Sequence, residues 1–334
     1  MIYNINDLKK ISYLIGKDKN LTQCAGGNTS FKNKNYLIIK SSGKWLADAN
    51  KLDIFTKINI SKIKEKVLKL RKLNQFDLLP VGKNNYKASI ETPLHLLFNY
   101  KFVVHYHPVD VNCILIKKNC DILLKNKINF IKWKFVKYFK PGFNLYKEVG
   151  KKLKKDKNIK IVFLQNHGIF IAGNNTLEIS KYIRKINKEV KFKETKFNYN
   201  KIKLKKYAKI LNMKVPQYKK INSLATNTKS FEVCNTKTGI LFPDQAVFLG
   251  KKMNCIEEKD LKKTKLNNSS YLIIKKVGVL INKKAKIEVV ELLLFISKVL
   301  LRLNKINDIN YLTKNEVASL VNWSEEKYRL NIKR

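Results

Sequence analysis

Short apolar segments alternate with amphipathic segments along most of the chain, and this alternation is the feature that most limits its fold. Residues 161–164 (IVFL) form a continuous apolar run typical of a buried strand, whereas Leu8, Ile11 and Ile15 recur at helical spacing. Regular alternation of strands and helices indicates an α/β or α+β protein. The expected strands are 29–31, 36–40, 101–107, 128–136, 161–164 and 169–172, and the expected helices are 4–20, 91–99, 109–126, 143–154 and 176–193, with a strand and then a basic helix within 52–73.

The second half of the chain is expected to form a smaller unit. Residues 194–222 are rich in lysine, contain Pro216 and predict a linker. The expected divisions are therefore a first domain over 1–193, this linker, and a C-terminal extension over 223–334. Residues 161–186 align with residues 271–296, and both segments have the pattern of a strand, a turn with glycine, a strand and a helix. Val277 stands at the position of His167. This match indicates either an ordinary likeness between such segments or a degenerate repeat that has lost its site.

Composition excludes several classes of protein. A chain of 334 residues with 44% hydrophobic residues can bury a core without disulfide or metal staples. The five cysteines are scattered and form no CxxC pair, which argues against a secreted disulfide framework and a cysteine-only zinc ribbon. The N-terminal segment lacks a signal pattern, and the most apolar stretch, 289–303, contains Lys298 and Arg302. We expect a soluble, cytoplasmic protein with no membrane partner.

The formal net charge of +45 suggests a nucleic-acid partner at first sight. Only five of the 70 basic residues are arginine, however, and nucleic-acid sites favour arginine for bidentate contacts. Lysine, asparagine and isoleucine are all abundant, as A/T-rich codons would produce. We therefore expect no specific nucleic-acid partner, although non-specific adhesion to polyanions follows from the charge.

The chain has four histidines, and three of them form a pattern that suits a metal. His105 and His107 form an H-x-H pair on an expected strand, so both imidazoles point to the same face. His167 lies in a turn before Gly168, whose lack of a side chain permits a close backbone approach. Neutral imidazoles on one rigid face can bind a divalent ion. Zinc is the default for three histidines, and Mn, Co or Fe would also fit.

A carboxylate and two small loops accompany the histidines. Glu91 and His95 are four residues apart, on one face of a helix that Ser89 is expected to cap. The carboxylate could ligate the ion or move protons, or the two residues could be an ordinary helical pair. The segments 26–30 (GGNTS) and 41–43 (SSG), the latter between Lys40 and Lys44, offer backbone N–H groups and hydroxyls to an anion, although many such loops are merely turns.

Together these segments resemble the class II aldolase/adducin family. The resemblance rests on AGGNTS at 25–30, IKSSGKWLADA at 39–49, SIETPLH at 89–95, VVHYHP at 103–108 and QNHG at 165–168. It covers about residues 25–190 and continues more weakly through 239–250 and 311–330. These later segments are similar to longer members of the family, related to rhamnulose-phosphate aldolase modules rather than to the short fuculose-phosphate enzymes.

The resemblance implies roles for individual residues. His105, His107 and His167 match the family's metal ligands, and Glu91 matches its catalytic carboxylate. The positions that hold the substrate phosphate are matched by Asn28, Ser42, Gly43 and Ser89. The implied reaction is cleavage or formation of a C–C bond in a ketose 1-phosphate through a metal-stabilised enediolate, with Glu91 moving the proton. An unassigned acid, usually a tyrosine, would protonate the aldehyde oxygen.

The resemblance also implies a three-layer α/β/α sandwich, a homo-oligomer that is commonly a tetramer, and a small phosphorylated sugar as substrate. The C-terminal unit would cover the cleft or support assembly. Two alternatives remain. The same centre could serve an epimerase, dehydratase or decarboxylase that acts on a phosphorylated sugar or sugar acid. Alternatively, the chain could be a metal-free, adducin-like scaffold, against which the retained metal-cleft residues argue.

Overall fold

A seven-stranded mixed sheet lies at the centre of the N-terminal part of the chain. The computed structural model describes residues 2–70, 86–263 and 269–332. The strand order is β3-β2-β1-β4-β7-β6-β5, and every neighbouring pair is antiparallel except β5 and β6. The strands are β1 (Asn28–Lys32), β2 (Tyr36–Lys40), β3 (Phe55–Asn59), β4 (Phe102–Tyr106), β5 (Trp133–Val136), β6 (Ile161–Leu164) and β7 (Gly168–Gly173).

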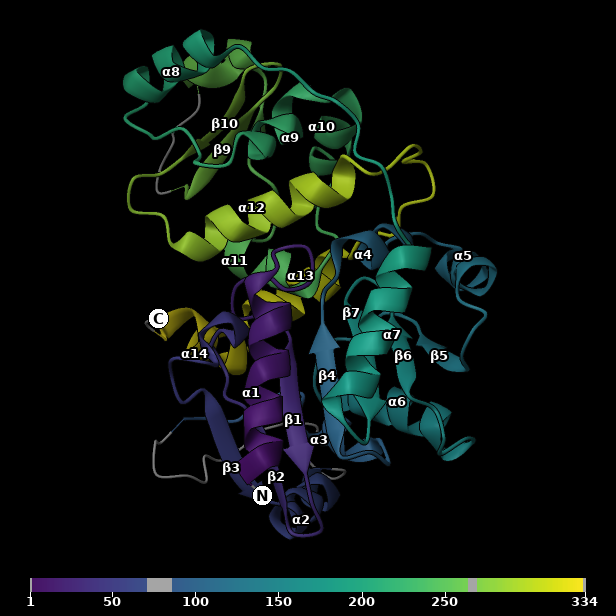
Figure 1. The fold of residues 1–334 in the computed structure, drawn as a ribbon. Helices are drawn as coiled ribbons and strands as arrows, with labels where there is room; N and C mark the ends of the chain where they lie inside the picture. The colour runs from purple at the N-terminus through teal and green to yellow at the C-terminus, as the bar shows by residue number, and fades with distance from the viewer. Residues whose placement is uncertain (1, 71–85, 264–268, 333–334) are drawn as a thin grey trace. The chain divides into compact units, whose positions relative to one another are not determined.

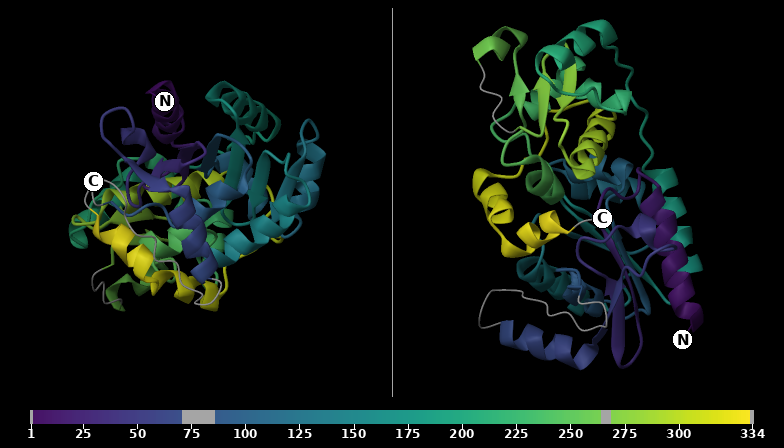
Figure 2. Two further views of the ribbon diagram at one scale, coloured as in Figure 1. Left: turned by 90° about the horizontal axis from the view of Figure 1, so that it is seen from below. Right: turned by 90° about the vertical axis from the view of Figure 1, so that its left-hand side faces the viewer.

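Helices cover both faces of this sheet. On one face α1 (Ile2–Lys17) and α7 (Thr176–Glu189) lie side by side and contact β1 and β7 (Figure 1). On the other face α3 (Thr92–Leu97) packs against α6 (Phe143–Lys154), and α2 (Ile60–Leu70) lies beside β3. The right-hand view of Figure 2 shows α1 and α2 on opposite sides of the first strands. The expected three-layer α/β/α architecture is confirmed.

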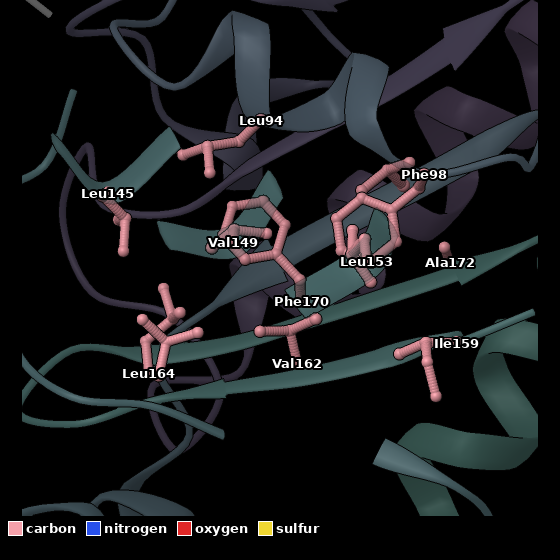
Figure 3. Close-up of a cluster of buried hydrophobic side chains, with 12 residues drawn as sticks. Leu94, Phe98, Leu145, Val149, Leu153, Ile159, Val162, Leu164, Phe170 and Ala172 are labelled. Carbon is pink, nitrogen blue, oxygen red and sulfur yellow. The ribbon is translucent and has the colours of Figure 1, made fainter. Parts of the chain in front are cut away.

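The core between α6 and the sheet follows from two periodicities. Leu145, Val149 and Leu153 recur every four residues on one face of α6, and all three are buried. Val162 of β6 and Phe170 of β7 point toward them from the sheet (Figure 3). Full burial of such side chains contributes roughly 1.5–3 kcal/mol each, so this cluster fixes the layer on which α3 rests.

The chain divides into two units. Unit 1 comprises residues 1–115, 119–191 and 322–334, and unit 2 comprises residues 116–118 and 192–321. Unit 1 also contains α4 (Val109–Leu115), α5 (Cys120–Lys127), α14 (Ser324–Asn331) and the 3-10 helix η1 (Leu46–Asp48).

Unit 2 has a three-stranded sheet of its own, in the order β10-β9-β8. Its long helix α12 (Ile287–Leu300) packs against α9, α10 and α11. The remaining elements are α8 (Lys201–Ile210), α9 (Ser223–Thr226), α10 (Thr228–Cys234), α11 (Pro243–Leu249), α13 (Lys314–Val321), β8 (Cys255–Ile256), β9 (Tyr271–Ile274), β10 (Gly278–Ile281), η2 (Lys219–Asn222) and η3 (Glu258–Lys263). Among the described residues, no helix combines the length and apolar character needed to cross a membrane.

Most expected elements occur where the sequence places them, and three segments differ. The helix expected over 109–126 is broken, because residues 117 and 309 pair as a β-bridge and Lys117 contacts Asp308 at 2.5 Å. The strand expected over 128–136 begins only at Trp133. The segment 194–222, expected as a linker, contains α8, whose Leu204 and Ala208 are buried in a core cluster of unit 2. Residues 71–73, expected to end the basic helix, lie outside the described residues.

Candidate metal centre

His105 and His107 meet at the end of β4. His105 is the fourth residue of the strand and His107 follows its last residue, so the two imidazoles share one face. Their Nε2 atoms are 3.1 Å apart. The backbone N–H of His107 donates to the carbonyl of Leu21, which fixes the chain as it leaves the strand.

His167 comes to the same point from the turn between β6 and β7. Its Nε2 is 3.3 Å from the Nε2 of His105. Asn166, just before it, has a φ of 54°, a conformation that asparagine tolerates better than most residues. A Cβ on Gly168 would lie 2.5 Å from the carbonyl oxygen of Tyr106 and 2.8 Å from Cδ2 of His107, so a side chain is excluded there.

The three imidazoles fit a divalent ion. All three residues are buried, and their ligand atoms lie within 4.8 Å of one another. Zinc–nitrogen bonds of about 2.0–2.1 Å separate tetrahedral ligand atoms by about 3.3 Å, close to the spacings observed here. Nδ1 of His105 lies 3.1 Å from the carbonyl oxygen of Ile169. Donation of an Nδ1–H to that oxygen leaves Nε2 of His105 free of hydrogen and able to bind a metal.

Glu91 lies against this cluster. It is the N-cap residue of α3, which begins with Thr92 and Pro93. One carboxylate oxygen, Oε2, is 3.4 Å from Nε2 of His105, and the other, Oε1, is 3.7 Å from Nε2 of His167. The carboxylate is buried, so it can exchange a proton only with groups inside the site.

Asn28 and Ser89 position this carboxylate. The Asn28 side-chain Nδ2 donates to Oε2 of Glu91 at 2.7 Å and to Oγ of Ser89 at 3.2 Å. The Ser89 hydroxyl oxygen also accepts from the backbone N–H of Glu91. Since α3 begins at Thr92 with Glu91 as its N-cap, Ser89 precedes the helix rather than capping it as expected.

The two anion-type loops are tied together by Lys40. Its buried ammonium donates to the carbonyl of Ala25 at 3.0 Å and to the carbonyl of Lys44 at 2.6 Å. The backbone N–H of Ser42 donates to the carbonyl of Lys87, so the hydroxyl of Ser42 is the group that it can offer to an anion. Gly43 has a φ of 75°, a region in which glycine pays no steric cost.

The last described residues of the chain lie on the second loop. A Cβ on Gly43 would be 2.5 Å from Cδ1 of Ile332. Lys87 lies 3.8 Å from Glu325 of α14 and over the ring of Tyr328. Residues 322–332, which were expected to belong to the C-terminal extension, therefore belong to unit 1.

Two sets of contacts in the site were not expected from the sequence. Lys40 was expected to flank an anion, whereas it holds two backbone segments together. His95 was expected to face Glu91, whereas the hydrogen bonds that join them run through Asn28. The polar residues Asn28, Ser30 and Lys32 recur with strand periodicity, and that pattern was the available signal for a polar face on β1.

Known proteins resemble this chain over its N-terminal part. The family model described as "Class II Aldolase and Adducin N-terminal domain" matches residues 6–188, more than half of the chain. The chain belongs to this family. The predicted resemblance is confirmed, and metal dependence is typical of the family's aldolases.

Individual relatives match over the same region. "Uncharacterized oxidoreductase YuxG" from Bacillus subtilis (strain 168) is 26% identical over 187 residues, which make up 52% of this chain. The chain spans 27% of that protein, about a quarter of its length.

Solved structures match over about the same share of the chain. The N-terminal class II aldolase domain of a conserved protein from Thermoplasma acidophilum is 27% identical, with a TM-score of 0.46, and the match covers 56% of this chain and 92% of that one. A sugar-phosphate aldolase from Thermotoga maritima is 17% identical with a TM-score of 0.45, covering 57% and 93%. An L-fuculose-1-phosphate aldolase from Thermus thermophilus is 16% identical with a TM-score of 0.40, covering 57% and 93%.

Proposed function

We propose that unit 1 is a metal-dependent carbon–carbon lyase that cleaves or forms a bond in a ketose 1-phosphate through an enediolate. The observation that carries the proposal is the position of Glu91, whose buried carboxylate lies 3.4 and 3.7 Å from two of three converging imidazole nitrogens. A base fixed beside a metal centre is what proton transfer at a carbon next to a carbonyl requires.

His105, His107 and His167 would hold one divalent ion, with zinc the first choice for a nitrogen-only set. A bound ion supplies Lewis-acid polarisation of the substrate's carbonyl and adjacent hydroxyl. The Nδ1–H of His105, held by the carbonyl of Ile169, keeps the Nε2 of this imidazole available as a ligand.

Glu91 would carry the proton to or from the substrate carbon. The Asn28 amide donates to Oε2 and holds the carboxylate plane in place. Burial keeps bulk water from competing for the proton.

The phosphate would be held by the hydroxyls of Ser42 and Ser89 and the backbone N–H of Gly43, with the Asn28 amide positioning Ser89. Asn28 and Ser89 contact each other and Glu91, so a phosphate bound there would be at a fixed distance from the base. Assembly into a homo-oligomer belongs to the same proposal, and light scattering on the purified protein tests it.

The experiment assays purified protein, loaded with zinc or manganese, on a panel of ketose 1-phosphates and phosphorylated sugar acids. Release of dihydroxyacetone phosphate and an aldehyde is expected. Glu91→Gln should lower turnover by about 10²–10⁴-fold while retaining the metal. The control is Glu148→Gln, which changes a surface carboxylate on α6 that pairs with Lys151.

Two results would contradict the proposal. Epimerised, dehydrated or decarboxylated products would show that the same centre catalyses one of those reactions instead of C–C bond cleavage. Failure of wild-type protein to bind any divalent ion would favour the metal-free scaffold.

A further inference from the structure

We propose that His95 is a positioning residue that acts through the Asn28 amide on Glu91. The proposal rests on the role of Glu91 proposed above, and His95 itself would touch neither substrate nor metal. Its side chain is fully buried on α3, next to the edge of Phe170. We infer this role from which atom donates and which atom accepts in each hydrogen bond between β1 and α3.

The contact with Glu91 identifies the orientation of the Asn28 amide. The Asn28 atom that lies 2.7 Å from Oε2 is Nδ2, the NH₂ group, which donates to this carboxyl oxygen. The same NH₂ group reaches the Ser89 hydroxyl at 3.2 Å. The amide oxygen Oδ1 therefore faces His95, and Nε2 of His95, 2.5 Å away, must carry the hydrogen.

The other side of the imidazole agrees with this tautomer. Nδ1 lies 2.7 Å from the hydroxyl of Ser30. Burial, and then the nearby His105 and Lys32, hold the pKa of His95 well below its usual value, so the ring is neutral. A neutral ring with hydrogen on Nε2 has a bare Nδ1, which accepts the hydroxyl hydrogen of Ser30.

One face of β1 supplies all of these partners. Asn28 and Ser30 bind the two ring nitrogens of His95, and the ammonium of Lys32 donates to the backbone carbonyls of His95 and Phe98. Three residues at strand spacing thus fix the side chain and the backbone of one residue on α3. The imidazole cannot turn without breaking bonds at both of its nitrogens.

This arrangement has a consequence for Glu91. If the Asn28 amide rotated by half a turn, its oxygen would face the carboxylate and repel it. The Nε2–H of His95 opposes that rotation because it needs an acceptor in the position of Oδ1. His95 therefore selects the amide orientation that donates to Glu91, as outer-shell partners orient ligands in metal sites.

Turnover tests this role in the metal-loaded protein. His95→Leu is expected to lower kcat by about 10–100-fold, the usual effect of removing an outer-shell partner, with KM and metal content nearly unchanged. His95→Gln can place an N–H near the position of Nε2 and should recover most of the loss. In an Asn28→Ala background, His95→Leu should cost little more. Phe98→Leu is the matched control, because the Phe98 ring packs on Phe170, as His95 does, and takes no part in this chain of hydrogen bonds.

A second measurement is independent of activity. Long-range ¹H–¹⁵N spectra of metal-free protein should show His95 as a neutral ring with hydrogen on Nε2, and four histidines make the assignment tractable. Hydrogen on Nδ1 instead, or equal kcat losses from His95→Leu with and without Asn28, would overturn the inference. If the wild-type protein releases no aldehyde from any ketose phosphate, the proposed lyase function fails, whereas the tautomer measurement still decides the role of His95.

Discussion

Units 1 and 2 contain the same hairpin and differ at the residue that ends its turn. In unit 1, β6 pairs with β7 from Leu164 and Gly168 onward, and in unit 2, β9 pairs with β10 from Ile274 and Gly278 onward. Unit 1 has His167 before the glycine, and unit 2 has Val277. Each hairpin also pairs in parallel with an outer strand, β5 or β8, and each precedes a long helix, α7 or α12.

The backbone hydrogen bonds of the two turns match residue by residue. The N–H of Asn166 donates to the carbonyl of Leu115, and the N–H of Lys276 donates to the carbonyl of Ala225. Asn166 and Lys276 both have a positive φ, 54° and 59°. Each of these residues of unit 1 is matched by the residue 110 positions later in unit 2: residue 166 by residue 276, and residue 115 by residue 225.

The strand that carries two histidines in unit 1 has a counterpart too. Val104 pairs with Ile171 in unit 1, and Lys214 forms a bridge with Ile281 in unit 2, again 110 residues later. On this correspondence Val215 and Gln217 occupy the positions of His105 and His107. The sequence left open whether the likeness is ordinary or a degenerate repeat, and we propose the repeat because the two turns share their hydrogen bonds and positive φ angles. These matches also show that the backbone of this turn forms without an imidazole, because the turn of unit 2 has Val277 in the position of His167.

Removal of two of the three proposed metal ligands of unit 1 should have the largest effect. His105→Ala/His107→Ala is expected to reduce the metal content from one ion per chain to nearly none, because one imidazole remains. Elemental analysis after dialysis measures this, and circular dichroism checks the fold. The control is Gln217→Ala, the matching position of unit 2, which should retain one ion. Equal metal content in the double variant and the wild type would show that the ligands lie elsewhere.

The two anion-type loops, 26–30 and 41–43, lie before the residues of unit 1 that have matching positions in unit 2. Phosphate binding should therefore depend on unit 1 alone. Ser42→Ala is expected to weaken binding of inorganic phosphate by about 10–100-fold, since a hydrogen bond to a charged group contributes about 1.5–3 kcal/mol. Titration calorimetry measures the affinity. Ser41→Ala is the control, because the Ser41 hydroxyl bonds to Thr56 in the interior. Unchanged affinity in Ser42→Ala, together with a lower melting temperature, would assign this loop a structural role only.

Gly168 and Gly278 occupy matching positions in the two turns, but replacing them should disturb different neighbours. Gly168→Ala would push against the Tyr106 carbonyl and the His107 ring, whereas Gly278→Ala would push against Asn222 and Leu204. Both should lower stability by about 1–3 kcal/mol. Only Gly168→Ala should also weaken metal binding, measured by competition with a chromophoric chelator. A similar loss of metal affinity in Gly278→Ala would break the comparison.

The smallest expected effect concerns the turn residue of unit 2. Lys276 is exposed and has a positive φ, which costs a residue other than glycine or asparagine about 1–2 kcal/mol. Lys276→Asn, which gives unit 2 the residue of unit 1, should raise stability by a few tenths to about 1 kcal/mol. Thermal unfolding measures the difference. A decrease in the unfolding midpoint would show that the lysine side chain makes a stabilising contact.

The sequence alone determined the local features of the site. The strand period placed His105 and His107 on one face. The sequence also predicted α6 with the bounds that the structure has, 143–154. The hairpin after residue 161 and its counterpart after 271 were also predicted from sequence. Each of these depends on neighbours within a few residues, so local periodicity was sufficient.

Tertiary structure decided which of these local pieces touch. Because β1 pairs with β4, Asn28 lies opposite His105, and the amide of Asn28 reaches Glu91 and His95, more than 60 residues further along the chain. The helix expected over 109–126 breaks because residues 116–118 belong with residues near 309. Lysine is usually exposed, but Lys40 is buried because its ammonium donates to the carbonyl of Ala25, on another loop, as well as to that of Lys44. Sequence periodicity reports which face of a segment is buried, and only the packing of distant strands decides what that face meets.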